Sequence, residues 1–264
     1  MRIGVFDSGL GGLTVVQAMR GVIKGAELFY VADTKHAPYG EKTTEQILQY
    51  SILITEYLRK NYHIEALIVA CNTATSAAIK SLREIYPELI IIGTEPGIKP
   101  AIAHTHTGKI GVLATPATLE GEKYQQLART LCQEREVTIY EQACPGLVQQ
   151  IEKGAIETPQ TEMMLRKWLD PMREKGVDTI VLGCTHYPLV SGVIENIMGN
   201  VTLIETGGAI AKHLLAQAEK KGHHNEGDLT IHIETTGEIV TSMIDRLIPQ
   251  HAGVKKIDLD PSSC

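Results

Sequence analysis

Two cysteines of this sequence, Cys71 and Cys184, stand in closely similar local contexts. Each follows a short, mostly apolar run, at 66–70 and 179–183, and each precedes polar residues. Short apolar runs that end in polar residues are typical of buried strands in a parallel sheet. Ligands of open α/β sheets bind beyond the carboxyl ends of the strands, so we predict that both thiols face a ligand site. Their polar neighbours are Asn72, Thr73, Thr185 and His186.

The chain has three further cysteines, which suit a different interpretation. Most free cysteines in proteins are small buried hydrophobic residues. That interpretation fits Cys132, inside a predicted helix, and Cys144, just before a proline. It fits Cys71 and Cys184 less well, because hydrogen-bonding side chains follow both of them at once.

Two thiols at one ligand site admit three chemistries. A disulfide redox couple usually has the spacing Cys-x-x-Cys, which is absent here. A zinc site could use Cys71, Cys184 and His186, but we expect neighbours on an extended Cys-Thr-His segment to point to opposite sides. The third chemistry is acid–base: one thiolate removes a proton from one face of a carbon, and the other thiol protonates the opposite face. An ordinary thiol pKa of about 8.5 is close enough to neutral for this work.

Asp7 and His186 are the neighbours that could assist the thiols. Asp7 ends the first predicted strand, and His186 lies two residues beyond Cys184. A carboxylate or an imidazole can hold or pass on the proton of a nearby thiol. The commoner uses of these residue types are a helix N-cap for Asp7 and a hydrogen-bonded loop histidine for His186. The residues alone leave both interpretations open.

Three turns offer neutral hydrogen-bond donors for a small anionic substrate. The glycine-rich segment at 7–12 lacks the third glycine of a dinucleotide fingerprint, and no phosphate-binding Gly-Lys-Ser/Thr motif occurs. Its backbone amides could instead meet a carboxylate. Pro38-Tyr39-Gly40 supplies amides and a phenol, and the segment from Thr115 to Thr118 supplies hydroxyls. All three segments could also be purely structural turns.

The order of apolar runs and amphipathic stretches predicts a doubly wound α/β fold with mainly parallel sheets. Strands are predicted at 2–6, 28–32, 66–70, 90–93, 109–113, 137–141, 179–183 and 201–204. Thr43-Thr-Glu-Gln46 is a capping-box pattern that starts a helix with Ile47, Tyr50, Ile54 and Leu58 on one face. A second apolar stripe comprises Ala78, Leu82 and Ile85. The segment after Gly222 alternates only weakly.

A short internal repeat suggests two pseudo-symmetric domains. The tripeptide Ile-Gly-Val occurs at 3–5 and at 110–112, and each copy is followed three residues later by a hydroxyl residue. Turn-forming residues near 95–97 and 205–208 are natural crossover points. We therefore expect one discontinuous domain of residues 1–95 and 206–264, with Asp7 and Cys71, and a second domain of residues 96–205, with Cys184 and His186.

Composition narrows the class of protein. The chain has 264 residues, of which 43% are hydrophobic and 21% charged, and a formal net charge of −6. These values are ordinary for a globular protein and predict no binding to nucleic acid or to an anionic membrane. The chain opens directly into a strand-like run without a signal-peptide pattern, and its five cysteines are scattered. We expect reduced thiols and a cytoplasmic location.

Four motifs together resemble the glutamate racemases of the aspartate/glutamate racemase superfamily, over residues 1 to about 210. They are Asp-Ser-Gly-Leu-Gly-Gly-Leu-Thr at 7–14, Pro-Tyr-Gly at 38–40, Cys-Asn-Thr-Ala at 71–74 and Gly-Cys-Thr-His-Tyr-Pro at 183–188. The resemblance implies two α/β domains with the active site in the cleft between them. It implies racemisation of glutamate without cofactor or metal, to supply D-glutamate for peptidoglycan, and commonly a homodimer.

The resemblance also implies a role for individual residues. Cys71 would take the α-proton of D-glutamate with help from Asp7, and Cys184 that of L-glutamate with help from His186. Glu152 matches an acidic position near the second thiol. The predicted substrate contacts, including those from the three turns, are Asp7, Ser8, Pro38, Tyr39, Gly40, Asn72, Thr73, Thr115, Thr118, Thr185 and His186. The sequence departs from many relatives at Lys35-His36, where an arginine is common.

Two rival functions share these features. A relative acting on aspartate would keep both cysteines and change only the pocket for the substrate side chain. A catalytically silent protein of this fold would bind an amino acid without exchanging its α-proton.

Overall fold

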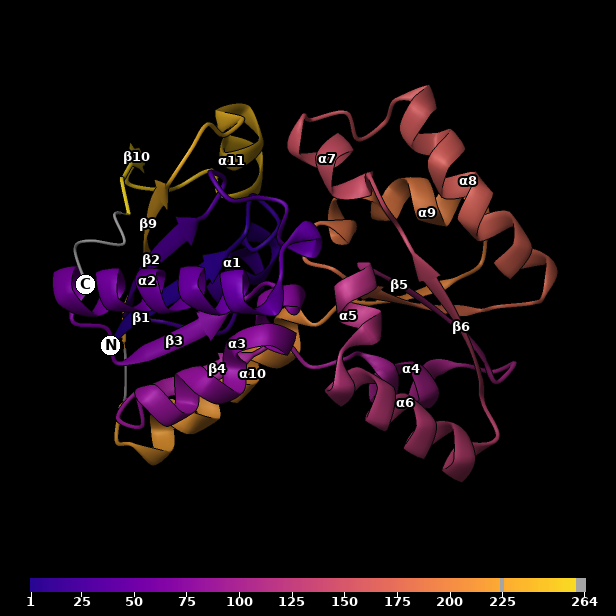
Figure 1. Cartoon of the computed structure of the whole chain (residues 1–264), viewed down its shortest axis with the longest axis horizontal. Coiled ribbons are helices and arrows are strands. Elements are labelled where there is room, and N and C mark those ends of the chain that lie inside the picture. Colours follow the sequence, from indigo (N-terminus) through magenta and orange to yellow (C-terminus); the bar gives the residue numbers. More distant parts are fainter. Residues whose placement is uncertain (224–225, 260–264) are drawn as a thin grey trace. The chain divides into compact units, whose positions relative to one another are not determined.

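A computed structural model describes residues 1–223 and 226–259, apart from the side chains of residues 133–135 (Figure 1). The chain forms two compact units. The first comprises residues 1–94 and the described chain from Gly207 onward, and the second comprises residues 95–206. None of the helices in the described ranges combines the length and the apolar character needed to cross a bilayer.

The first unit is built on a six-stranded sheet in the order β10-β9-β2-β1-β3-β4, in which every pairing is parallel. Its register aligns Asp7 with Ala32 and Phe6 with Val69. The residues that follow β1, β2 and β3 therefore emerge at the same edge of the sheet. The strands are β1 (Arg2–Asp7), β2 (Glu27–Ala32), β3 (Ala66–Val69), β4 (Ile90–Gly93), β9 (Thr230–Thr235) and β10 (Val254–Lys256).

Helices cover both faces of this sheet. Phe6 and Val69 share an apolar cluster with residues of α2 and α3, and Figure 1 shows α2 crossing in front of the strands. Val5 and Ile68 alternate with these residues and so point to the other face, where α1 contacts α10 and α11. The elements are α1 (Leu13–Arg20), η1 (Tyr39–Glu41), α2 (Thr44–Tyr62), α3 (Asn72–Ile85), α10 (Gly207–Lys220) and α11 (Thr241–Leu247).

The second unit has a four-stranded parallel sheet in the order β6-β5-β7-β8. Val112 packs with α4, α5 and α6, whereas the neighbouring Gly111 approaches Met172 of α8. Its strands are β5 (Lys109–Ala114), β6 (Thr138–Ala143), β7 (Thr179–Gly183) and β8 (Thr202–Ile204). Its helices are α4 (Ile98–His104), α5 (Pro116–Glu120), α6 (Glu122–Arg135), α7 (Leu147–Glu152), α8 (Pro159–Glu174), η2 (Tyr187–Val190) and α9 (Ser191–Met198).

The two units share one strand order. In each, the first strand of the unit lies between the second and the third, and the fourth lies beyond the third. The α/β class with parallel sheets, predicted from the sequence, is confirmed. The strand order reverses between the first and third strands, which is where open α/β sheets place their ligands. Cys71 follows the third strand of one unit, and Cys184 follows the third strand of the other.

Local predictions mostly agree with the structure. The capping box at Thr43 and Gln46 is present, and Ile47, Ile54 and Leu58 are buried. Ile85 was expected on the apolar face of α3, but it is 48% exposed, because the helix ends there.

Strands β9 and β10 had no clear signature in the sequence. In β9, Ile231 and Ile233 alternate with the polar residues His232 and Glu234, so the strand contains only a short alternation of apolar and polar residues. The polar side chains are nevertheless covered: Phe29 stacks on His232, and two tyrosines of α2 hydrogen-bond Glu234. Tertiary packing therefore stabilises a strand that hydropathy alone does not predict.

Candidate active site

The first thiol lies at the junction of β3 and α3. Cys71 is the N-cap of α3, and its Sγ accepts a hydrogen bond from the Ala74 amide at 3.4 Å. Ser8 Oγ, beyond the end of β1, lies 3.9 Å from the same sulfur. A sulfur at the amino end of a helix, facing a backbone N–H, is in an environment that favours its negatively charged form.

Asp7 ends β1 beside this thiol's strand and is completely buried. Its Oδ1 accepts a hydrogen bond from the Gly9 amide at 3.0 Å. Helix α1 begins only at Leu13, with Gly12 as its N-cap, so the alternative role of Asp7 as a helix N-cap is wrong. The carboxylate is instead held by the glycine-rich turn itself.

Gly12 is required by the close packing of this turn. A Cβ at that position would lie 2.6 Å from Asp7 Cβ and 2.7 Å from Tyr30 Oη. Tyr30 in turn donates a hydrogen bond to the Gly9 carbonyl at 2.5 Å. The turn therefore packs directly around the backbone and side chain of Asp7.

The second thiol belongs to a chain of three polar side chains. Cys184 Sγ lies 3.7 Å from His186 Nδ1, and His186 Nε2 lies 2.5 Å from Glu152 Oε1. The expectation that Cys184 and His186 point to opposite sides of an extended segment is wrong, because residues two positions apart share one side even when the chain is extended. The chain turns directly after β7, with the Tyr187 amide donating to the Cys184 carbonyl, and this turn brings the thiol and the imidazole together.

The environment of His186 favours its protonated form. Burial alone would lower the pKa of the imidazole, but the hydrogen bonds to Cys184 and Glu152 and the charge of Glu152 raise it well above its ordinary value. Glu152 is the last residue of α7, where the helix dipole disfavours a negative charge. The imidazolium therefore compensates a carboxylate in an unfavourable position.

Cys132 and Cys144 differ from the two strand-end thiols. Burial raises the pKa of Cys132, and it raises the pKa of Cys144 much further. Both therefore remain protonated near neutral pH. Cys144 is buried, as expected of a thiol that acts as a small apolar residue, whereas Cys132 is only partly buried.

The predicted substrate contacts lie at the carboxyl ends of strands. Ser8 follows β1, and Pro38, Tyr39 and Gly40 lie in the connection after β2. Asn72 and Thr73 form the first turn of α3. In the second unit, Thr115 caps α5 and its Oγ1 lies 2.9 Å from Thr118 Oγ1, while Thr185 lies between Cys184 and His186.

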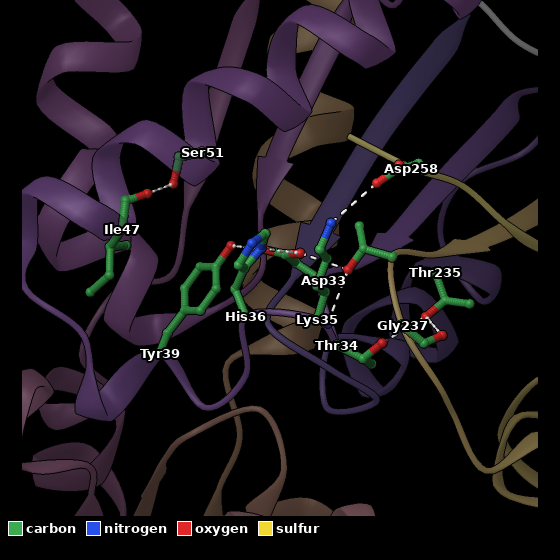
Figure 2. A network of polar contacts seen from close by, with 11 residues as sticks. Asp33, Thr34, Lys35, His36, Tyr39, Ile47, Ser51, Thr235, Gly237 and Asp258 are labelled. Carbon is green, nitrogen blue, oxygen red and sulfur yellow. Dashed lines mark hydrogen bonds and ion pairs between the residues drawn. The ribbon is translucent and has the colours of Figure 1, made fainter. Parts of the chain in front are cut away.

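The phenol of Tyr39, one of the predicted substrate contacts, already donates its proton within the protein. Its hydroxyl donates a hydrogen bond to Asp33 Oδ2 at 2.6 Å, and the residue is 1% exposed (Figure 2). Sequence reasoning missed Asp33, although a carboxylate directly after a predicted strand repeats the position of Asp7. The backbone amides of the Tyr39 turn remain a predicted substrate contact.

A zinc site was the second chemistry considered for the thiols. Within the part of the chain that the structure describes, no group of three or more His, Cys, Asp or Glu side chains is placed to hold a metal ion. Cys184 Sγ lies near one ring nitrogen of His186, and the other ring nitrogen contacts Glu152, so both nitrogens of the imidazole already have polar partners within the protein.

Comparison with known proteins decides the family. The family model described as Asp/Glu/Hydantoin racemase matches residues 13–214. The chain belongs to this family. It is 64% identical to the glutamate racemase of Sulfurovum sp. (strain NBC37-1) over 264 residues, which cover all of both chains. The family resemblance inferred from the four motifs is confirmed.

Solved structures of racemases have the same fold. Glutamate racemase isoform RacE1 from Bacillus anthracis matches with a TM-score of 0.85 and 32% identity, over 97% of each chain. The glutamate racemase of Francisella tularensis, solved in complex with D-glutamate, matches with a TM-score of 0.80 and 25% identity, over 100% of this chain and 98% of that one. The fold of these two glutamate racemases therefore extends over at least 97% of this chain.

Proposed function

We propose that this protein interconverts L- and D-glutamate with Cys71 and Cys184 as the two acid–base groups, and that the product D-glutamate serves peptidoglycan synthesis. The observation that carries the proposal is the equivalent placement of the two thiols. Each follows the third strand of a sheet with the same strand order, and each has a different proton-handling partner beside it. A different partner for each thiol is consistent with one thiol acting on D-glutamate and the other on L-glutamate.

The reaction conserves protons and electrons without a cofactor. The Cys71 thiolate takes the α-proton of D-glutamate, and the electron pair of the broken C–H bond stays on the substrate as a carbanion. The Cys184 thiol then gives its proton to the opposite face, which forms L-glutamate and leaves the Cys184 thiolate. The reverse direction exchanges the two roles. Each sulfur must approach the α-carbon to about 3–3.5 Å for such a transfer.

The two partners prepare the thiols differently. Asp7 is an acceptor that can hold the proton released by Cys71, and it lies in a fully buried turn where its orientation is fixed. His186 places a ring nitrogen 3.7 Å from the Cys184 sulfur, close enough to exchange a proton with that thiol. Proton transfer by positioned groups of this kind typically contributes about 10²–10⁴-fold in rate.

Substrate binding is assigned to polar groups around the two strand ends, most of them neutral donors. We assign contacts to the substrate carboxylates and ammonium to Asp7, the Ser8 hydroxyl, the backbone of Pro38-Tyr39-Gly40, and the polar residues after each thiol. The latter are Asn72, Thr73, Thr185 and His186, with Thr115 and Thr118 as further hydroxyl donors. Donors directed at the carboxylate stabilise the charge that develops on it when the α-proton leaves.

The wider setting follows from the chemistry. Catalysis needs Cys71 and Cys184 reduced, which fits the cytoplasm, where thiols are kept reduced. The substrate is the small molecule glutamate, with no nucleic-acid or membrane partner. A homodimer is the proposed assembly.

Exchange of the α-proton with solvent tests the proposal. In deuterated water, each pure enantiomer of glutamate should lose its α-proton signal in the NMR spectrum and reach an equal mixture of both hands. Aspartate should exchange far more slowly. Rapid exchange of aspartate with inert glutamate would identify the wrong substrate, and glutamate binding without exchange would identify a silent binding protein. Loss of exchange after chelation, with restoration by zinc, would favour the metal alternative.

A further inference from the structure

The end of β2 carries a buried carboxylate that the proposed reaction does not use. Asp33 follows β2 directly and is 1% exposed. Its Oδ1 accepts from Thr236 Oγ1 at 2.7 Å, its Oδ2 accepts from Tyr39 Oη at 2.6 Å, and His36 Nδ1 lies 2.9 Å and 3.0 Å from the two oxygens. Figure 2 shows Tyr39 and His36 converging on this carboxylate. A charge that is removed from water needs such partners.

These contacts leave Asp33 no direct part in binding. Three donors of the protein surround the carboxylate, the hydroxyls of Thr236 and Tyr39 and one ring nitrogen of His36 that lies near both oxygens, and burial of Asp33 keeps it from a ligand in solution. The carboxylate therefore acts on the site only through the groups that it holds.

One of those groups, Tyr39, connects Asp33 to the first thiol. Tyr39 packs in the same apolar cluster as Cys71, and its turn contacts helix α3, which begins at that thiol. Burial, followed by the charge and hydrogen bond of Asp33, raises the pKa of Tyr39 well above its ordinary value, so the phenol stays a donor. On the other side, the Asp33 amide donates to the Asp7 carbonyl at 2.9 Å.

A distant part of the chain completes the arrangement. Thr236 follows β9, and besides Asp33 it contacts the Lys35 amide, which donates to its hydroxyl at 3.0 Å. Thr34 and Thr235 share a hydrogen bond of 2.8 Å. The loop after β2 is therefore tied at one end to β9 and at the other, through Tyr39, to the core beside Cys71.

We propose that Asp33 is a positioning residue that holds the Pro38-Tyr39-Gly40 backbone in place to receive a carboxylate of the substrate. The identity of that substrate rests on the function proposed above, but the ordering of the loop does not. Because the loop would act on bound substrate before and during proton transfer alike, its loss should weaken binding more than it slows chemistry.

A double-mutant cycle separates this role from direct contact by the phenol. Asp33→Asn and Tyr39→Phe should each raise the KM for glutamate about 10-fold and change kcat less than about threefold. If the phenol acts through Asp33, the double variant should also raise KM only about 10-fold. An effect near 100-fold, the product of the single effects, would show that Tyr39 and Asp33 act independently and would overturn the proposal, as would an unchanged KM in Asp33→Asn.

Two further variants test specificity. Thr236→Val removes a donor to Asp33 from outside the proposed substrate contacts and should raise KM by a smaller factor, about threefold. Ser51→Ala is the matched control, since it removes a buried hydroxyl that bonds only the Ile47 carbonyl of its own helix, at 2.7 Å (Figure 2). A KM increase in Ser51→Ala as large as that in Thr236→Val would assign the effect to general packing and defeat the proposal.

Hydrogen exchange without substrate provides a readout that does not depend on activity. Amides of residues 36–42 should exchange about 10-fold faster in Asp33→Asn than in the wild type, while the amides of α2 stay protected. Unchanged exchange in this segment would refute the positioning role. If the wild type failed to racemise glutamate, only the proposed function would fall, and the exchange experiment would still decide the role of Asp33.

Discussion

His186 and Glu152 lie 34 positions apart in the chain, yet Nε2 of the first is 2.5 Å from Oε1 of the second. The contact joins the turn after β7 to the carboxyl end of α7. His186 is buried and its other nitrogen faces Cys184, so the thiol and the carboxylate together favour the charged form of an imidazole that adjoins the proposed catalytic thiol.

Replacement of Glu152 by Gln should lower the pKa of His186, since it removes a charge that stabilises the imidazolium. Histidine NMR should detect the decrease directly. Proton abstraction by Cys184 should slow by about 10²-fold. Elimination from a glutamate analogue with a leaving group reports this step. Elimination from the L-enantiomer should slow, and elimination from the D-enantiomer should change little. Equal slowing with both enantiomers would contradict the link between Glu152 and Cys184.

The same pair predicts how stability depends on pH. A raised histidine pKa in the folded state contributes stability that is fully present below the unfolded value, about 6.5, and is lost as pH rises through the folded pKa. Glu152→Gln should therefore cost most stability near pH 6 and progressively less in alkali. Denaturant titrations of both proteins from pH 6 to pH 10 test this; a difference that grows with pH would reverse the sign and refute it.

Cys71→Ser and Cys184→Ser should each reduce racemisation by at least about 10²-fold, because both thiols act in every turnover. Racemisation rates cannot assign the faces, since the enantiomers have equal free energy and kcat/KM is the same in both directions. Elimination needs only one proton abstraction. Cys71→Ser should lose elimination mainly from the D-analogue and Cys184→Ser mainly from the L-analogue, and the opposite pattern would exchange the assigned roles.

Gly12→Ala tests the close packing around Asp7. The added Cβ has no room between Asp7 and Tyr30, so the free energy of unfolding should decrease by about 1–3 kcal/mol. Activity should also fall, because Asp7 is displaced. Gly208→Ala is the matched control, because no atom lies within 4 Å of a Cβ there and the residue is in helix α10. Thermal denaturation should show a lower midpoint for the first variant and an unchanged or higher one for the second. Similar midpoints for Gly12→Ala and the wild type would disprove the packing argument.

Asp178 should give the second unit an acid-sensitive contribution to stability. Burial works against its charge, but hydrogen bonds from Thr105, Thr107, His106 and Thr179 lower its pKa to about 2. A depressed carboxyl pKa contributes stability that is present above about pH 4 and lost as pH falls through the folded value. Asp178→Asn should destabilise this unit by about 1 kcal/mol at pH 7, allowing for solvent screening, and by much less near pH 2.

Hydrogen exchange of β5 and β7 across this pH range measures that contribution. Glu174→Gln, which removes an exposed carboxylate at the end of α8, serves as the control and should change little at any pH. A constant difference between Asp178→Asn and the wild type down to pH 2 would exclude the carboxylate's charge as the cause.

The sequence by itself determined the features that depend on near neighbours. Strand-like runs of four or five residues marked eight of the ten strands in the described chain, and the capping box marked the start of α2. Strand ends followed by Asp7, Cys71 and Cys184 indicated where chemistry could occur, because parallel strands deliver such residues to one edge of the sheet. Hydrophobic period and capping act over a few residues, so they can be read without a structure.

Only the tertiary structure decided which polar groups meet. The contact of His186 with Glu152 and the convergence of Tyr39 and Thr236 on Asp33 join residues that differ in chain position by 6 to 203. Strand β9 likewise could not be predicted from hydropathy, because its Glu234 is buried by hydrogen bonds with tyrosines of α2. Such pairings depend on chain topology and on the compensation of buried charge, and neither is encoded in a local pattern of residues.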